Sequence, residues 1–115
     1  MFIDIIDISM TQLIKALEER RQLLEKYSNA ILLLPKGNDD KYKNLYFYLI
    51  QASLFADPES GITMNELTSL MKTSTSTVNR RLGDIGSQLI QVNKHGRTFY
   101  FKLNLEELDK LMLNQ

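Results

Sequence analysis

TSTSTVNRRLGDIG, residues 73–86, can be interpreted as a polar loop or as a helix, and the function expected of the chain depends on which is correct. Its Ser, Thr and Asn residues are typical of a loop, but three apolar residues recur at i, i+4 and i+7, the spacing of one helix face. These residues are Val78, Leu82 and Ile85. Ser74 can cap such a helix, because its hydroxyl can accept a hydrogen bond from an N–H of the first turn. We therefore predict a helix over residues 75–87 with a polar outer face, rather than a linker.

Two further helices are expected before this stretch. Between residues 9 and 34, apolar side chains recur at helical spacing and charged side chains occupy the opposite face, which is an amphipathic pattern. The segment PKGNDD (35–40) combines Pro, Gly and Asx residues and should end this helix. Residues 42–56 are apolar on two sides, which predicts the central helix of the core. DPESG (57–61) should break that second helix.

The rest of the chain predicts a short strand, a short helix, a β-hairpin and a last helix. The hairpin strands alternate apolar and polar residues and flank KHGR, in which His95-Gly96 is the expected turn. The expected ranges are 62–63 for the short strand, 65–72 for the short helix, 89–93 and 98–103 for the hairpin strands, and 104–112 for the last helix. The predicted fold class is therefore mainly α with a small β-hairpin, an α+β domain.

The charge of the chain is unevenly distributed, although its formal net charge is +0. Residues 72–102 carry six Lys or Arg side chains and one acidic side chain, Asp84. Residues 1–71 carry seven basic and ten acidic side chains, and residues 103–115 carry one basic and three acidic side chains. A basic segment in a neutral chain indicates an anionic partner.

Composition excludes several classes of protein. With 115 residues, the chain is long enough for one domain and too short for two. Cysteine is absent from the sequence, which excludes disulfides, thiolate metal sites and a Cys nucleophile. The apolar N-terminus is interrupted by Asp4 and Asp7 and has no preceding basic region, so we expect no targeting segment and no membrane span, and a cytoplasmic protein.

Catalytic motifs are missing from the sequence. It has no Gly-rich phosphate loop, no HExxH and no nucleophile-elbow pattern. Three pairs of adjacent carboxylates occur, at 18–19, 39–40 and 106–107, but neighbours on a helix diverge by about 100° and indicate a solvated surface. We therefore expect no enzyme, no catalytic residue, no cofactor and no metal site.

Residues 62–103 resemble the winged helix-turn-helix superfamily of DNA-binding proteins. The stretch NELTSLMKTSTSTVNRRLGDI and the hairpin around KHGR carry the resemblance. The positions that match the pattern are Ser74, Thr77, Val78, Arg80, Leu82, Ile85, Gly96 and Arg97. The hairpin followed by NLEELDKLML is most similar to dimeric prokaryotic regulators of the ArsR and MarR types. The resemblance implies binding of double-stranded DNA and a role as a transcriptional regulator, most simply a repressor.

The sequence also predicts a domain organisation and a homodimer. We expect one domain over residues 1–115, with an N-terminal helical extension (1–40) for dimerisation, a winged-helix core (41–104) and a C-terminal helix (105–115). The first and last helices carry apolar stripes wider than a thin domain can bury, which predicts a dimer interface; the alternative is a first helix folded back on its own domain. Metal-sensing relatives use Cys, or Asp and His on the last helix. This chain has no Cys and its single imidazole is His95, so we expect no metal-sensing role.

DNA contacts are expected from the helix at 75–87 and from the hairpin tip. Hydroxyl and guanidinium groups can reach base edges, whereas phosphate contacts fix the register of the protein on the duplex. We assign Thr75, Ser76 and Arg80 to base edges; Ser74, Thr77, Asn79 and Arg81 to phosphates or flanking bases; and Lys94, His95 and Arg97 to the wing. The alternative is a solvated helix face and an ordinary exposed turn.

Two other functions are compatible with the sequence. The first keeps DNA binding but places it in plasmid or phage partition, replication or conjugation. The second is a winged helix used as a protein-interaction module, against which the basic segment and the Ser/Thr/Asn-rich helix both argue. A cluster of aromatic residues in the second helix suggests either a ligand pocket or, as its helical spacing favours, a packed core. These residues are Tyr42, Tyr46, Phe47, Tyr48 and Phe55.

Overall fold

A computed structural model describes residues 2–55 and 61–114 of the chain, and for residues 2–9 only the course of the backbone. These residues form a mainly helical fold with a small three-stranded antiparallel sheet, which confirms the α+β prediction. The elements are α1 (Phe2–Asn29), the 3-10 helix η1 (Ala30–Leu33), α2 (Asp40–Phe55), β1 (Ile62–Thr63), α3 (Met64–Met71), α4 (Thr75–Ile85), β2 (Ile90–His95), β3 (Thr98–Leu103) and α5 (Leu105–Leu113).

The sheet has the order β1-β3-β2, so β3 lies in the middle. β1 pairs only with Phe101 and Tyr100 of β3, and the β2–β3 hairpin therefore extends beyond it as a two-stranded ribbon. His95 pairs with Thr98, which leaves Gly96 and Arg97 as the two turn residues. The predicted turn at His95-Gly96 is therefore wrong by one residue. Gly96 has φ 63°, a left-handed conformation that glycine adopts without strain at the first position of such a turn.

α2 is the centre of the hydrophobic core, as its apolar residues on two sides predict. Leu45, Tyr46, Leu49 and Ile50 of this helix are completely buried. The remaining elements cover it with Leu67, Val78, Leu103 and Leu108, which are also fully buried. Of the aromatic cluster, Tyr42 and Tyr46 lie in this core, Phe47 and Tyr48 pack partly against it, and Phe55 is exposed. The packed-core interpretation therefore holds for all of the cluster except Phe55.

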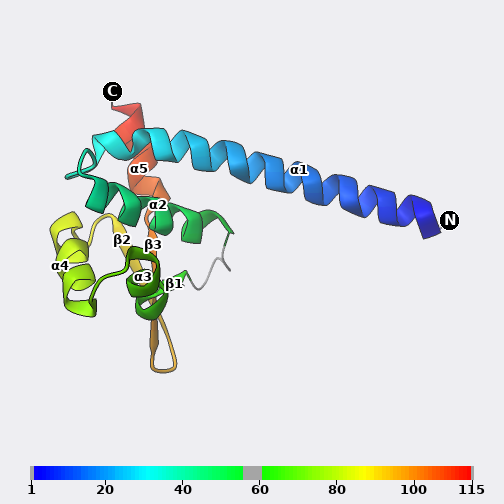
Figure 1. Ribbon diagram of the computed structural model, residues 1–115. Helices are drawn as coiled ribbons and strands as arrows, with labels where there is room; N and C mark the ends of the chain where they lie inside the picture. The colour runs from blue at the N-terminus through cyan, green and yellow to red at the C-terminus, as the bar shows by residue number, and fades with distance from the viewer. Residues whose placement is uncertain (1, 56–60, 115) are drawn as a thin grey trace.

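α1 is longer than predicted and extends away from the rest of the fold (Figure 1). It begins at Phe2 instead of residue 9, and its last turn tightens into η1 instead of continuing as an α-helix to residue 34. Tyr27 is 6% exposed in the core, whereas Leu13 and Leu17 are 58% and 48% exposed. The part of the helix around Leu13 is therefore not folded back on its own domain, and its apolar stripe is uncovered within the described residues.

The other element boundaries differ from the predicted ones by one or two residues. α4 ends at Ile85 instead of residue 87, because Gly86 leaves the helix with φ 99°. β2 runs over residues 90–95 instead of 89–93, since its pairing with β3 continues to the turn. α2 begins at residue 40, and α3 spans 64–71 instead of 65–72. The predicted end of α2 at residue 56 and most of the predicted break at 57–61 lie outside the described residues.

Tyr27 connects the C-terminal part of α1 to α5. Its hydroxyl donates a 2.9 Å hydrogen bond to Oδ1 of Asp109. Burial of the ring, together with this hydrogen bond and the negative charge of Asp109, raises the pKa of Tyr27 to about 12. The folded domain therefore stabilises the neutral, protonated form of the Tyr27 side chain.

Replacement of Tyr27 by Phe should make the domain less sensitive to alkaline pH. The folded-state pKa lies above the ordinary tyrosine value of about 10, so the phenol proton stabilises the fold fully below about pH 10. This contribution is lost as the pH rises through about 12. Urea denaturation between pH 8 and 12 should show a steeper fall in the free energy of unfolding for the wild type than for Tyr27→Phe. Parallel curves would contradict this role of Tyr27.

Candidate nucleic-acid interface

α4 is anchored to the core by one face and capped as predicted. Val78, Leu82 and Ile85 are buried, and Ser74 accepts a 3.2 Å hydrogen bond from the backbone N–H of Thr77. The Ser74 hydroxyl also lies 3.1 Å from that of Ser76 and 2.9 Å from that of Thr77. Ser74 is therefore already engaged within the first turn, and it orders the hydroxyls around it. These contacts confirm that the Ser/Thr-rich stretch is a helix start.

The exposed face of α4 presents short polar side chains and one arginine. Thr75, Ser76, Asn79 and Arg80 are all exposed. Hydroxyl, amide and guanidinium groups are the side chains that hydrogen-bond to base edges in the major groove. The exposed face of α4 therefore carries hydrogen-bond donors and acceptors that suit base edges, on a helix whose other face is anchored in the core.

A shallow hollow joins this face of α4 to the β2–β3 hairpin. Thr75 and Asn79 form its α4 side, and Arg97 and Phe99 form its hairpin side. Its volume is about 500 Å³. Phe99 was not among the residues predicted from the sequence for this surface. The period-2 alternation of the hairpin places Phe99 and Lys94 on one face of it, but does not reveal that this face is directed towards α4.

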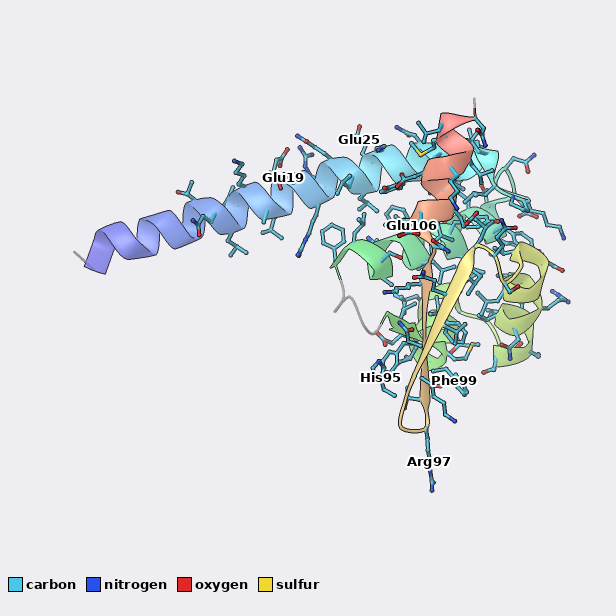
Figure 2. All side chains as sticks on the ribbon, turned by 180° about the vertical axis from the view of Figure 1, so that it is seen from behind. Glu19, Glu25, His95, Arg97, Phe99 and Glu106 are labelled. Atoms are coloured by element: carbon cyan, nitrogen blue, oxygen red, sulfur yellow. The ribbon has the colours of Figure 1, made fainter. Side chains whose placement is uncertain are left out.

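The three predicted hairpin residues point in different directions. Lys94 pairs with Phe99 across the strands, and its Nζ lies 5.4 Å from the centre of that ring. His95 lies on the opposite face, where it makes an edge-to-face contact with Tyr100 at 5.6 Å. Arg97 extends from the tip, and Figure 2 shows it beyond the last residues of both strands. Lys94 and Arg97 are therefore near the hollow beside α4, whereas His95 is directed away from it.

Arg81 lies on the other side of α4 from the hairpin. Unlike Arg80 it is half-buried, and it lines a second hollow together with Lys41 of α2 and Lys72 at the end of α3. Arg81 was predicted, together with Ser74, Thr77 and Asn79, to contact phosphates or flanking bases, and neither lysine was among the predicted residues. No local signal could have identified them, since Lys41 is 40 residues away in the sequence and is brought to α4 by the packing of α2.

Asp84 is the single acidic residue of the basic segment, and its charge is compensated. The Tyr42 hydroxyl donates a 2.6 Å hydrogen bond to Asp84 Oδ2, and Lys36 Nζ lies 3.5 Å from the same oxygen. The hydrogen bond from Tyr42 and the Lys36 ammonium lower the pKa of Asp84, against an opposing effect of desolvation. Asp84 therefore remains ionised, with Tyr42 and Lys36 as its hydrogen-bond and ion-pair partners, and the positive charge of Arg80 also lowers the pKa of this exposed carboxyl.

Other kinds of site and the comparisons with known proteins add no further assignment. No cluster of three or more His, Cys, Asp or Glu side chains that could hold a metal ion occurs in the described part of the chain. None of the helices over residues 2–55 and 61–114 is long and apolar enough to cross a membrane.

Comparisons with protein-family models, curated proteins and solved structures give no match to this chain.

Proposed function

We propose that the chain is a winged helix-turn-helix protein that recognises specific sequences in double-stranded DNA. In this proposal α3 and α4 are the helix-turn-helix, α4 enters the major groove, and the β2–β3 hairpin is the wing. One observation carries the proposal: α4 is held by three buried side chains while its exposed polar face lies next to a projecting hairpin that carries Lys94 and Arg97. The ion pair between Lys36 and Asp84 further supports it, because this pair offsets the single acidic charge of residues 72–102, which would otherwise repel the phosphates of DNA.

The residues expected to read bases lie on the exposed side of α4. Thr75 and Ser76 are in its first turn, which in this motif is the part that contacts base edges. Arg80 is exposed one turn later and is long enough for a bidentate contact to guanine. Thr77, Asn79 and the hairpin cations would contact phosphates or flanking bases and so fix the register of the protein on the duplex.

We further infer that the protein is a homodimer and a transcriptional regulator, most simply a repressor. The uncovered apolar stripe of α1 continues the seam that its C-terminal part buries in the core, which supports a second copy as its partner. α5 adds exposed Leu111 and Leu113. Two-fold symmetry would place one α4 from each subunit in successive major grooves, about 34–36 Å apart.

Selection of bound sequences from random duplex DNA tests this function directly. A palindromic motif with half-sites separated by about one helical turn is expected for the dimeric regulator. Enrichment of iterated direct repeats would instead favour a role in partition, replication or conjugation. Failure to enrich any sequence would refute specific DNA recognition.

The exposed stripe of α1 also favours a second candidate function, a protein-interaction module. In this alternative the stripe around Leu13 and Leu17 binds another protein, and the α4 face has no role in binding. The module would show no affinity for duplex DNA at moderate salt. The DNA selection therefore separates the two candidates.

Replacement of Lys94 by Ala should weaken binding to all DNA sequences by a similar factor. Its ammonium lies over the Phe99 ring and is suited to a phosphate contact that carries no sequence information. The slope of log K against log salt should decrease in magnitude by about 1 per lost contact. Fluorescence anisotropy at several salt concentrations measures the slope. Lys15→Ala, which removes an exposed lysine from α1, is the control and should leave the slope unchanged.

A further inference from the structure

A second basic hollow lies on the side of α4 that faces away from the hairpin. It has a volume of about 310 Å³ and is formed where the start of α2, the end of α3 and the middle of α4 meet. Its polar lining consists of Lys41, Asn44, Tyr48, Lys72, Thr73 and Arg81. We propose that this hollow, named here the α2–α4 hollow, binds a backbone phosphate of DNA. The inference rests on the proposed function and adds a contact surface to it.

The charges of the α2–α4 hollow are not compensated within the protein. In the part of the chain that the structure describes, Lys41, Lys72 and Arg81 form no side-chain hydrogen bond or ion pair. The hollow has no Asp or Glu among its described lining residues. Arg81 is half-buried and has no carboxylate partner among the described residues. Three cations around one hollow repel one another, and an anion bound between them would remove this repulsion.

Neutral groups in the hollow suit a phosphate diester. The side chains of Asn44, Tyr48 and Thr73 can each donate a hydrogen bond, and none of them does so to another described residue. Arg81 offers a planar set of N–H donors that matches two phosphate oxygens. Lys72 has the left-handed backbone conformation that ends α3, with φ 53°, and this places it in the turn directly before α4.

The position of the hollow agrees with the path of DNA around a helix in the major groove. A helix in that groove has one phosphate backbone on each side. The hairpin, with Lys94 and Arg97, lies on one side of α4, and the α2–α4 hollow lies on the other. α4 would therefore be held by cations on both flanks. A backbone phosphate accounts for this placement, whereas a free anion would not require the hollow to be next to α4.

The test compares three variants of the full chain on the selected duplex. Lys41→Gln and Lys72→Asn remove two cations of the hollow, and Asn tolerates the left-handed conformation of residue 72. Lys43→Gln is the matched control, because Lys43 is an exposed lysine of the same helix that does not line the hollow. We expect each hollow variant to bind about tenfold more weakly with an unchanged sequence preference, as the loss of one charge-assisted hydrogen bond implies. The control should bind like the wild type.

A neutral methylphosphonate at single positions of the duplex locates the contact. At the phosphate that occupies the hollow, this substitution should weaken the wild type more than it weakens Lys41→Gln, which has already lost one of the contacts to that phosphate, whereas at other phosphates the two losses should add. Thermal unfolding confirms that each variant is folded.

Each alternative result overturns the proposal. Equal losses for Lys41→Gln and Lys43→Gln would show a general charge effect instead of a site. Unchanged binding of both hollow variants, with binding still weakened by Arg80→Ala, would refute the hollow but leave the proposed function intact. If the wild type binds no duplex DNA, both the hollow and the proposed function fail.

Discussion

Replacement of Leu13 and Leu17 by Asp is expected to convert the protein from a dimer into a monomer and to lower its affinity for the selected palindrome about 100-fold or more. Both leucines lie on the exposed stripe of α1, at positions 58% and 48% exposed, and contribute nothing to the core of their own domain. Carboxylates at these positions would have to be buried without a partner in a helix–helix interface, which is unfavourable. The monomer should therefore remain folded but lose the linked binding of two half-sites.

Sedimentation velocity measures the oligomeric state, and anisotropy with the full palindrome and with a single half-site measures affinity. Gln12→Asp with Gln22→Asp is the matched control, because it adds two carboxylates to exposed positions of the same helix that are already polar. The control should remain a dimer. Affinity for a single half-site should be similar in all three proteins. A wild type that sediments as a monomer, or a double aspartate variant that remains dimeric, would show that α1 is not the dimer interface.

The parts of the fold that could be predicted from the sequence depend on local periodicity. Val78, Leu82 and Ile85 identify one buried face of α4 because the helical period alone brings them together. Ser74 marks the helix start for a similar reason, since the capping hydrogen bond spans only three residues. The hairpin strands follow from the alternation of apolar and polar residues. The turn was predicted one residue too early, because His95 still pairs with Thr98 and the turn residues are Gly96 and Arg97.

The rest of the candidate site depends on tertiary packing, which periodicity does not contain. Arg80 and Arg81 are neighbours of the same type in the sequence, yet one is exposed and the other lines the α2–α4 hollow. This difference depends on where α2 packs, as does the contact between Lys41 and the flank of α4. Compensation of Asp84 by Lys36 and Tyr42 has the same origin. Charge counted along the sequence therefore locates the basic segment but not the side of α4 on which each cation lies.

Replacement of Arg80 by Ala is the second change with a large expected effect, and it should alter the sequence preference as well as the affinity. Arg80 is the exposed arginine of α4, and in the described part of the chain its guanidinium forms no ion pair with a carboxylate. It is therefore available for a bidentate contact to guanine O6 and N7. Loss of this contact should cost about 1–3 kcal/mol per half-site and reduce the penalty for replacing that guanine.

The comparison with a phosphate-contacting residue makes the Arg80 assignment specific. We would measure binding of the wild type, Arg80→Ala and Lys94→Ala to the selected site and to each of its single-base variants. For each protein, this gives the penalty at every position, which is the loss of binding free energy when that base pair is replaced. Arg80→Ala should reduce that penalty at one base pair in each half-site and leave the others unchanged, whereas Lys94→Ala should reduce affinity without changing any penalty. Arg80→Lys should recover part of the affinity, since lysine keeps the charge but lacks the planar pair of donors. If Arg80→Ala retains every base penalty of the wild type, the side chain contacts the backbone, and the bases must be read by the hydroxyls of Thr75 and Ser76 instead.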